Sequence, residues 1–186
     1  SRSGGGPLID LGVHGIDLTR YLMGNPLPVS VYGATFQKLL NRPGIKDSVD
    51  YVASGASVDG ICDVEDLATA LVRYDNGAVL EIETSYSLNL REDRYTQELF
   101  GTKGGVKMSP DLEFYTDVNG YMSNITLANA EQYTDESHMF EDEINHFVDC
   151  ILNGTPCRAS AEDGVQIMRI LDAIYESAKT GHEIIL

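Results

Sequence analysis

Four polar side chains near the N-terminus have the types and the spacing that proton-transfer chemistry requires. On a helical wheel at about 100° per residue, Asp10, His14, Asp17 and Tyr21 fall within a sector of roughly 60°. Most of the remaining circumference is apolar or small. Burying Asp and His costs several kcal/mol unless they are paired or line a wet cavity. We therefore expect the stripe to face a pocket, although a purely structural pair of Asp10 with His14 has the same spacing.

The chemistry that this stripe supports is general acid–base catalysis. An imidazole exchanges its proton near neutral pH, so His14 suits the role of a base or proton relay. An exposed pair at i, i+4 contributes about 0.2–0.5 kcal/mol, whereas a shift of one pKa unit corresponds to about 1.4 kcal/mol. Asp10 is therefore expected to orient the imidazole without strongly changing its pKa, unless the site is dry.

The elements that must position the stripe follow from hydrophobic periodicity and turn residues. Residues 7–23 form an expected helix that ends at Gly24, and residues 29–36 form an expected strand. Asn76-Gly77 joins strands 67–74 and 78–86 in a hairpin, and we interpret 37–64 as a loop or excursion. The other expected elements are strands 94–101, 112–115 and 121–127, a link at 102–105, and helices 140–152 and 161–180.

This order of elements predicts an α+β fold with a predominantly antiparallel open sheet and helices packed on one face. The sequence has no G-x-G-x-x-G turn between a strand and a helix. No Rossmann domain and no cofactor-binding residue are therefore expected in this chain.

Composition excludes several classes of partner. The 186 residues carry a formal net charge of −16, which repels a phosphate backbone, so nucleic-acid binding is not expected. No run of 18 apolar residues and no signal-peptide pattern occurs, so we expect no membrane partner and a cytoplasmic location. Cys62, Cys150 and Cys157 lack CxxC spacing and are interpreted as ordinary reduced thiols, with no metal site expected.

Several segments together resemble the Gfo/Idh/MocA oxidoreductases. Residues 4–17, GGGPLIDLGVHGID, are similar to the family's GGGxLxDxGxHxxD segment. Residues 140–154, FEDEINHFVDCILNG, resemble its FxxEIxxFxxxIxxG helix. FGTKGG at 100–105 resembles its GTxGG loop, and AEDG at 161–164 with IYESA at 174–178 resembles its closing helix. The matches occur in the family's order along nearly the whole chain.

The resemblance implies a division of labour with a domain outside this sequence. Family members carry an N-terminal dinucleotide-binding domain and a Glu-Lys-Pro lysine, and neither is present here. Residues 1–186 then correspond to the C-terminal substrate-binding and oligomerisation domain. NAD or NADP would be bound mainly by the absent domain, so residues 1–186 alone are expected to be inactive.

The resemblance also assigns roles to single residues. His14 is expected to take the proton from a secondary alcohol of a sugar, polyol or related substrate, and Asp10 to hold His14 and bind a neighbouring hydroxyl. Asp17 is either a substrate contact or a structural residue. Further substrate contacts are expected from four residues that are otherwise an exposed strand end: Tyr86, Asn89, Arg91 and Arg94.

Two other functions remain open at this point. One is a non-catalytic ligand-binding or oligomerisation module, which the missing cofactor domain favours. The other is a family enzyme that uses NAD as a transient oxidant in glycoside cleavage or isomerisation. In either case, the mixed character of the second sheet face predicts a homodimer or homotetramer formed through the sheet.

Overall fold

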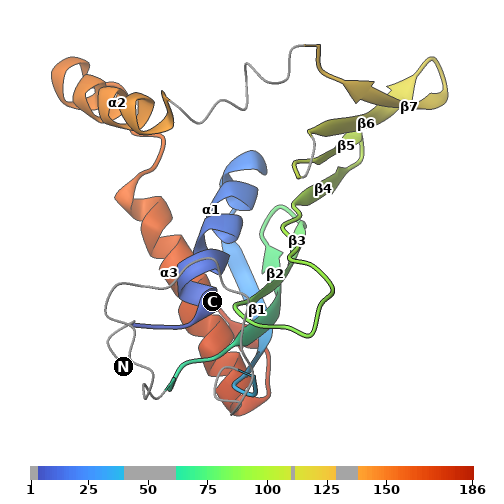
Figure 1. The fold of residues 1–186 in the computed structure, drawn as a ribbon. Coiled ribbons are helices and arrows are strands. Elements are labelled where there is room, and N and C mark those ends of the chain that lie inside the picture. The colour runs from blue at the N-terminus through green and yellow to red at the C-terminus, as the bar shows by residue number, and fades with distance from the viewer. Residues whose placement is uncertain (1–3, 40–61, 110–111, 129–137) are drawn as a thin grey trace. The chain divides into compact units, whose positions relative to one another are not determined.

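The computed structural model describes residues 4–39, 62–109, 112–128 and 138–186. They form two compact units. The first comprises Ser1–Arg91 with Glu162–Leu186, and the second comprises Glu92–Ala161 (Figure 1). Most of the loop expected at 37–64 lies outside the described residues.

The first unit is a four-stranded antiparallel sheet with two helical segments (Figure 1). A π-helical stretch, η1, leads directly into α1, so the helix expected at 7–23 is confirmed apart from this wider first part. The strands lie in the order β3-β2-β1-β8. The element bounds are η1 Leu8–Gly12, α1 Val13–Leu22, β1 Pro28–Phe36, β2 Leu67–Tyr74, β3 Val79–Ser85, α3 Ala161–Thr180 and β8 Ile184–Ile185.

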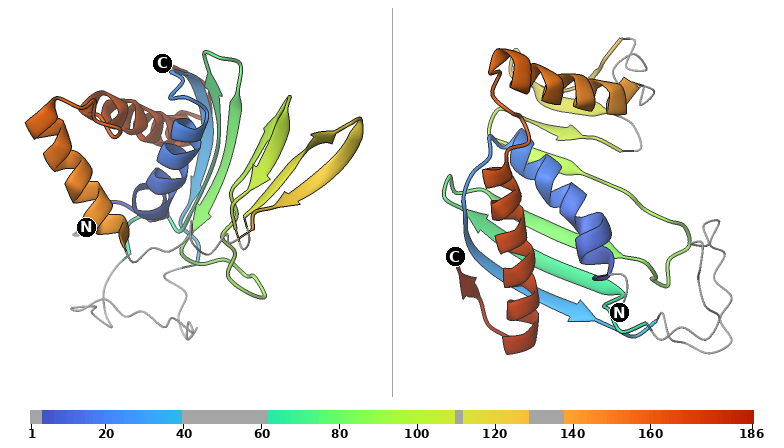
Figure 2. Two further views of the ribbon diagram at one scale, coloured as in Figure 1. Left: turned by 90° about the horizontal axis from the view of Figure 1, so that it is seen from above. Right: turned by 90° about the vertical axis from the view of Figure 1, so that its left-hand side faces the viewer.

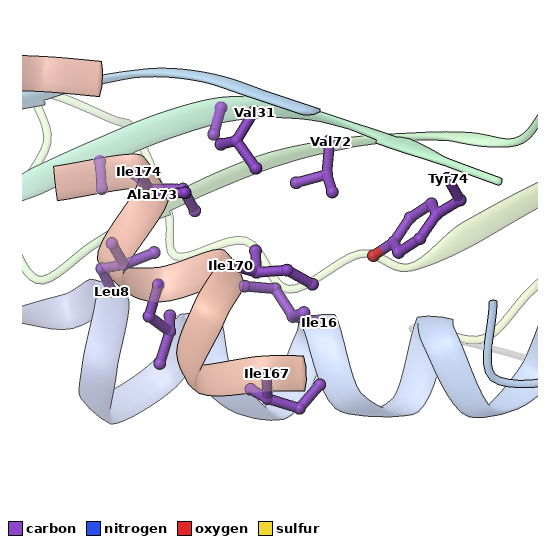
Figure 3. Close-up of a cluster of buried hydrophobic side chains, with 12 residues drawn as sticks. Leu8, Ile16, Val31, Val72, Tyr74, Ile167, Ile170, Ala173 and Ile174 are labelled. Carbon is purple, nitrogen blue, oxygen red and sulfur yellow. The ribbon is translucent and has the colours of Figure 1, made fainter. Parts of the chain in front are cut away.

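Both α1 and α3 cover the same face of this sheet, as the two views of Figure 2 show. An apolar core lies between the helices and the sheet, and it contains side chains from the η1–α1 segment, from α3 and from the strands (Figure 3). Six of its members are fully buried: Leu8, Ile16, Val31, Val72, Ile170 and Ile174. Fully burying one such side chain contributes about 1.5–3 kcal/mol. This core therefore holds η1 and α1 in a fixed position against the sheet.

The hairpin predicted around Asn76-Gly77 is confirmed. β2 pairs with β3 from Leu67 opposite Ser85 to Arg73 opposite Val79. Gly77 has a φ of 85°, which favours glycine, and the Asn76 side chain accepts a hydrogen bond from the Ala78 amide. Alternate β2 side chains are buried, while Leu71 and Arg73 point to the uncovered face.

The second unit contains a four-stranded antiparallel meander and one helix. The link expected at 102–105 is wrong in part, because Gly104 and Gly105 belong to a strand. Gly101 pairs with Gly104, so only Thr102 and Lys103 form the turn. The bounds are β4 Glu98–Gly101, β5 Gly104–Lys107, β6 Glu113–Val118, β7 Tyr121–Thr126 and α2 Met139–Asn153.

The antiparallel α+β architecture is confirmed, but the strands divide into two sheets instead of one. The division follows from residues 86–97, none of which joins a strand ladder. The two-residue strand β8 was not expected, because it is too short to show a period. No helix in the described ranges is long and apolar enough to cross a membrane.

Candidate functional site

Asp10 and His14 lie on the continuous helical segment formed by η1 and α1. Asp10 is in the π-helical part, a feature that often occurs at functional sites. Leu8 and Ile16, on the opposite side of the segment, are completely buried, whereas Asp10 and His14 are exposed. The polar stripe is therefore accessible to a ligand, and its backbone is held from behind by the core.

The carboxylate of Asp10 is held by a tyrosine that directly follows β3. The Tyr86 hydroxyl donates a hydrogen bond of 2.8 Å to Oδ2 of Asp10. Tyr86 directly follows β3, and its amide donates to the carbonyl of Asp66. In the described part of the chain Asp10 makes no hydrogen bond to His14, so the expected direct pairing of these two side chains is not seen.

The environment keeps the Tyr86 hydroxyl protonated. Burial, the hydrogen bond to Asp10 and the negative charges of Asp10 and Glu65 all raise the pKa of Tyr86 above its ordinary value. Tyr86 therefore remains a donor to the Asp10 carboxylate throughout the physiological pH range. Among the described residues no side chain bonds Oδ1 of Asp10, so this oxygen can accept a hydrogen bond from a bound hydroxyl group.

A second carboxylate–phenol pair supports the start of η1. Oε1 of the buried Glu65 accepts hydrogen bonds from the Leu8 amide, at 3.2 Å, and from the Tyr175 hydroxyl, at 2.8 Å. The pKa of Tyr175 is raised by burial, by the hydrogen bond to Glu65 and its negative charge, and by electrostatic interaction with the nearby Tyr86. Glu65 thus connects the first turn of η1 with α3 and with the chain entering β2.

Gly6 is the residue that lets Glu65 approach so closely. A Cβ at this position would lie 2.4 Å from the Glu65 carbonyl oxygen and 2.5 Å from its carboxyl carbon. No real Cβ tolerates such contacts with backbone. Gly6, the last glycine before the helix, therefore allows Glu65 to pack closely against the backbone.

Sequence reasoning missed Glu65 and Tyr175. Tyr175 has the helical spacing of a core residue, and Glu65 stands beside other acids in Asp63-Val64-Glu65-Asp66. The two residues are 110 positions apart, so only the folded chain brings them together. The signal available was local: an acidic residue two positions before a strand with alternating buried side chains.

Within the described part of the chain, the structure does not bring together the other residues that were expected at the site. Asp17 is exposed on α1, and Asn89 and Arg91 are exposed in the segment that follows β3. Arg94 belongs to the second unit. Their roles as substrate contacts stay predictions, whereas Tyr86 is found beside Asp10.

Comparisons with known proteins show what the chain as a whole is similar to. The family described as "Oxidoreductase family, C-terminal alpha/beta domain" matches residues 1–186. The chain is 35% identical over 182 residues to D-glucoside 3-dehydrogenase of Escherichia coli (strain K12), covering 96% of this chain and 48% of that protein. It is 28% identical over 205 residues to levoglucosan dehydrogenase of Pseudarthrobacter phenanthrenivorans, covering 96% and 51%.

One of the similar solved structures is levoglucosan dehydrogenase in complex with NADH and L-sorbose. It superposes with a TM-score of 0.69 at 26% identity, covering 98% of this chain and 50% of that one. The chain thus spans about half the length of the curated relatives that it matches.

Proposed function

We propose a function from one premise: the chain belongs to the Gfo/Idh/MocA oxidoreductase family, whose C-terminal α/β domain it matches over residues 1–186. It forms the substrate-binding half of an NAD(P)-dependent dehydrogenase that oxidises a secondary hydroxyl of a sugar or polyol. The observation that carries the proposal is the exposed Asp10–His14 stripe on a helix fixed by the core, with Asp10 held by Tyr86. Relatives named as glucoside and levoglucosan dehydrogenases support a sugar substrate.

The dinucleotide does not fit the glycine run of this chain. Pyrophosphate binds where free amides at a helix N-terminus face an open space. Here the Leu8 amide is already bonded to the Glu65 carboxylate, and that negative charge lies against Gly6. We therefore assign the nucleotide to a part of the enzyme outside these residues, where a bound nicotinamide supplies a hydride acceptor.

The residues of this chain act on the hydroxyl group that is oxidised. Asp10 uses Oδ1, the oxygen that Tyr86 does not hold, to accept a hydrogen bond from a substrate hydroxyl and so fixes the sugar ring. His14, one helical turn further on, accepts the hydroxyl proton as the carbon–oxygen double bond forms. Because His14 is exposed in this chain, that proton can pass on to water.

The experiment is a substrate screen of the complete enzyme with NAD⁺ and NADP⁺ against glucosides, anhydrosugars, aldoses and polyols. We expect net formation of NAD(P)H with at least one of them, and His14→Ala should lower kcat by roughly two to four orders of magnitude. Asp172→Asn, on the exposed side of α3, is the control and should leave kcat unchanged.

Two results of this screen contradict the proposal. A His14→Ala variant with the wild-type rate would place the base elsewhere. Conversion of the sugar without net NAD(P)H would instead support a transient use of the nucleotide.

A further inference from the structure

Three side chains in the second unit bring together donor atoms that suit a soft metal ion. Nε2 of His146, Sγ of Cys150 and Sγ of Cys157 all lie within 4.8 Å of one another. His146 and Cys150 occupy successive turns of α2, and Cys157 comes from the segment after that helix. The proposed dehydrogenase chemistry, which uses residues of the first unit, has no role for them.

The end of α2 explains how Cys157 returns to the helix. Gly154 caps α2 with a φ of 69°, and its amide donates to the carbonyl of Cys150. This left-handed cap reverses the chain direction after Asn153. The Arg158 amide then donates a hydrogen bond of 3.1 Å to Nε2 of His146. The loop is thus already folded back over the imidazole and the Cys150 thiol.

The spacing of the donors is close to that of a tetrahedral zinc site. Zn–S bonds of about 2.3 Å and Zn–N bonds of about 2.0–2.1 Å place neighbouring sulfur and nitrogen about 3.6 Å apart, and two sulfurs about 3.8 Å apart. Nε2 of His146 and Sγ of Cys150 are 3.6 Å apart. Bringing Cys157 to the same spacing requires a movement of about 1 Å or less, and Cys157 is exposed on a loop.

The imidazole presents the nitrogen that a metal needs. Nε2 accepts the Arg158 amide hydrogen, so its lone pair points toward the loop, and the neutral ring then carries its proton on Nδ1. A metal would take the place of that amide hydrogen, and two thiolates would neutralise a divalent charge. Two sulfurs and one imidazole select zinc, whereas magnesium and calcium prefer oxygen ligands.

We propose that His146, Cys150 and Cys157 bind one zinc ion, with water as the fourth ligand, and that the ion fixes residues 154–158 to the end of α2. A search for CxxC spacing does not find this set, because the cysteines are seven positions apart and the third ligand is a histidine one turn before the first. The site is independent of the proposed sugar site, so either proposal can fail alone.

The test uses the complete, untagged protein, stripped of metal and kept reduced, and titrated with Co²⁺ and then with Zn²⁺. We expect one Co²⁺ per chain, with a sulfur-to-cobalt charge-transfer band and the strong visible bands of tetrahedral cobalt, both lost when Zn²⁺ displaces it. Zinc should also protect Cys150 and Cys157, but not Cys62, from alkylation as mapped by mass spectrometry.

Variants decide which residues hold the ion. Cys150→Ser, Cys157→Ser and His146→Gln should each weaken binding more than about a hundredfold, since loss of even an outer-shell partner costs 10–100-fold. Cys62→Ser, in the first unit, is the matched control and should bind normally. Circular dichroism verifies that each variant is folded.

The following outcomes overturn the proposal. One is cobalt binding without a charge-transfer band, and another is equal weakening by Cys62→Ser. The third is a Cys150–Cys157 disulfide that persists in reductant and excludes the metal.

Discussion

The hydrogen bond from Tyr86 to Asp10 makes a quantitative prediction for Tyr86→Phe. The change removes one hydroxyl and leaves the ring, so the Asp10 carboxylate loses its donor. A hydrogen bond to a charged group contributes about 1.5–3 kcal/mol when buried, and Tyr86 is 41% exposed, which favours the lower end. About 1.4 kcal/mol corresponds to a tenfold change in rate. We therefore expect kcat/KM of the complete enzyme to fall about tenfold.

The assay is steady-state NAD(P)H formation with the best sugar from the screen, together with thermal unfolding. Tm should fall by no more than about 3–6 °C, because the lost hydrogen bond is partly exposed and contributes about 1.5 kcal/mol. Tyr121→Phe, an exposed tyrosine of β7, is the matched control and should leave both quantities unchanged.

A double-mutant cycle then tests whether Tyr86 acts through Asp10. Residues in direct contact show coupled effects, so Asp10→Ala with Tyr86→Phe should be no slower than Asp10→Ala alone. A wild-type kcat/KM in Tyr86→Phe, or losses that simply multiply in the double variant, would refute the reasoning.

Other predictions concern stability and assembly. Tyr74 is buried, and its hydroxyl has no hydrogen-bond partner in the described part of the chain. Tyr74→Phe should therefore leave the free energy of unfolding unchanged or raise it by up to about 1 kcal/mol. A large loss of this free energy in a denaturant titration would contradict the prediction. Burial raises the pKa of Tyr74 from 10.0 to about 12. The unfolded chain therefore loses this proton first, and stability should fall as the pH rises from 10 to 12. The Tm of Tyr74→Phe should fall less steeply over the same pH range than the Tm of the wild type. Asp163→Ala removes the 2.8 Å ion pair of the buried Arg20 and should destabilise the protein by about 1.5–3 kcal/mol; an unchanged denaturation midpoint would show that the pair contributes nothing. Leu71→Glu, on the uncovered face of β2, should dissociate the expected homo-oligomer in sedimentation velocity, and an unchanged sedimentation coefficient would exclude this face as the interface.

The helices and the hairpin could be predicted because their signals are local. Residues 161–180 show helical periodicity up to Gly181, and α3 has those bounds. Asn76-Gly77 between alternating residues fixed the β2–β3 turn. In both cases the hydrophobic period of the element and the residues that end it lie within one short stretch of sequence, so they can be recognised without the fold.

The π-helical start and the two sheets could not be predicted, because they depend on contacts between distant segments. η1 begins where the Leu8 amide meets Glu65, 57 positions away. The divided sheet depends on where residues 86–97 leave the ladder, and no periodic pattern marks that point. Gly104–Lys107 was missed as a strand because its two glycines resemble a turn.

At the candidate site, the stripe of Asp10 and His14 was predicted from the helical wheel, and both side chains are exposed on the helical segment. That the stripe lines a pocket stays a prediction. The hydrogen-bond partner of Asp10 was not predicted. The i, i+4 rule pointed to His14, whereas the carboxylate bonds with Tyr86 at the end of β3. Helical spacing identifies possible neighbours on one element, but it does not show that a side chain following β3 reaches the same carboxylate.

The proposed roles of Asp10 and His14 are tested most directly by a crystal structure of the complete enzyme with a sugar or polyol that the screen identifies. We predict a ring nitrogen of His14 at hydrogen-bond distance, about 2.6–3.2 Å, from the hydroxyl that is oxidised, and the Asp10 carboxylate bonded to a neighbouring hydroxyl. A sugar bound elsewhere, with His14 facing open solvent, would contradict the account.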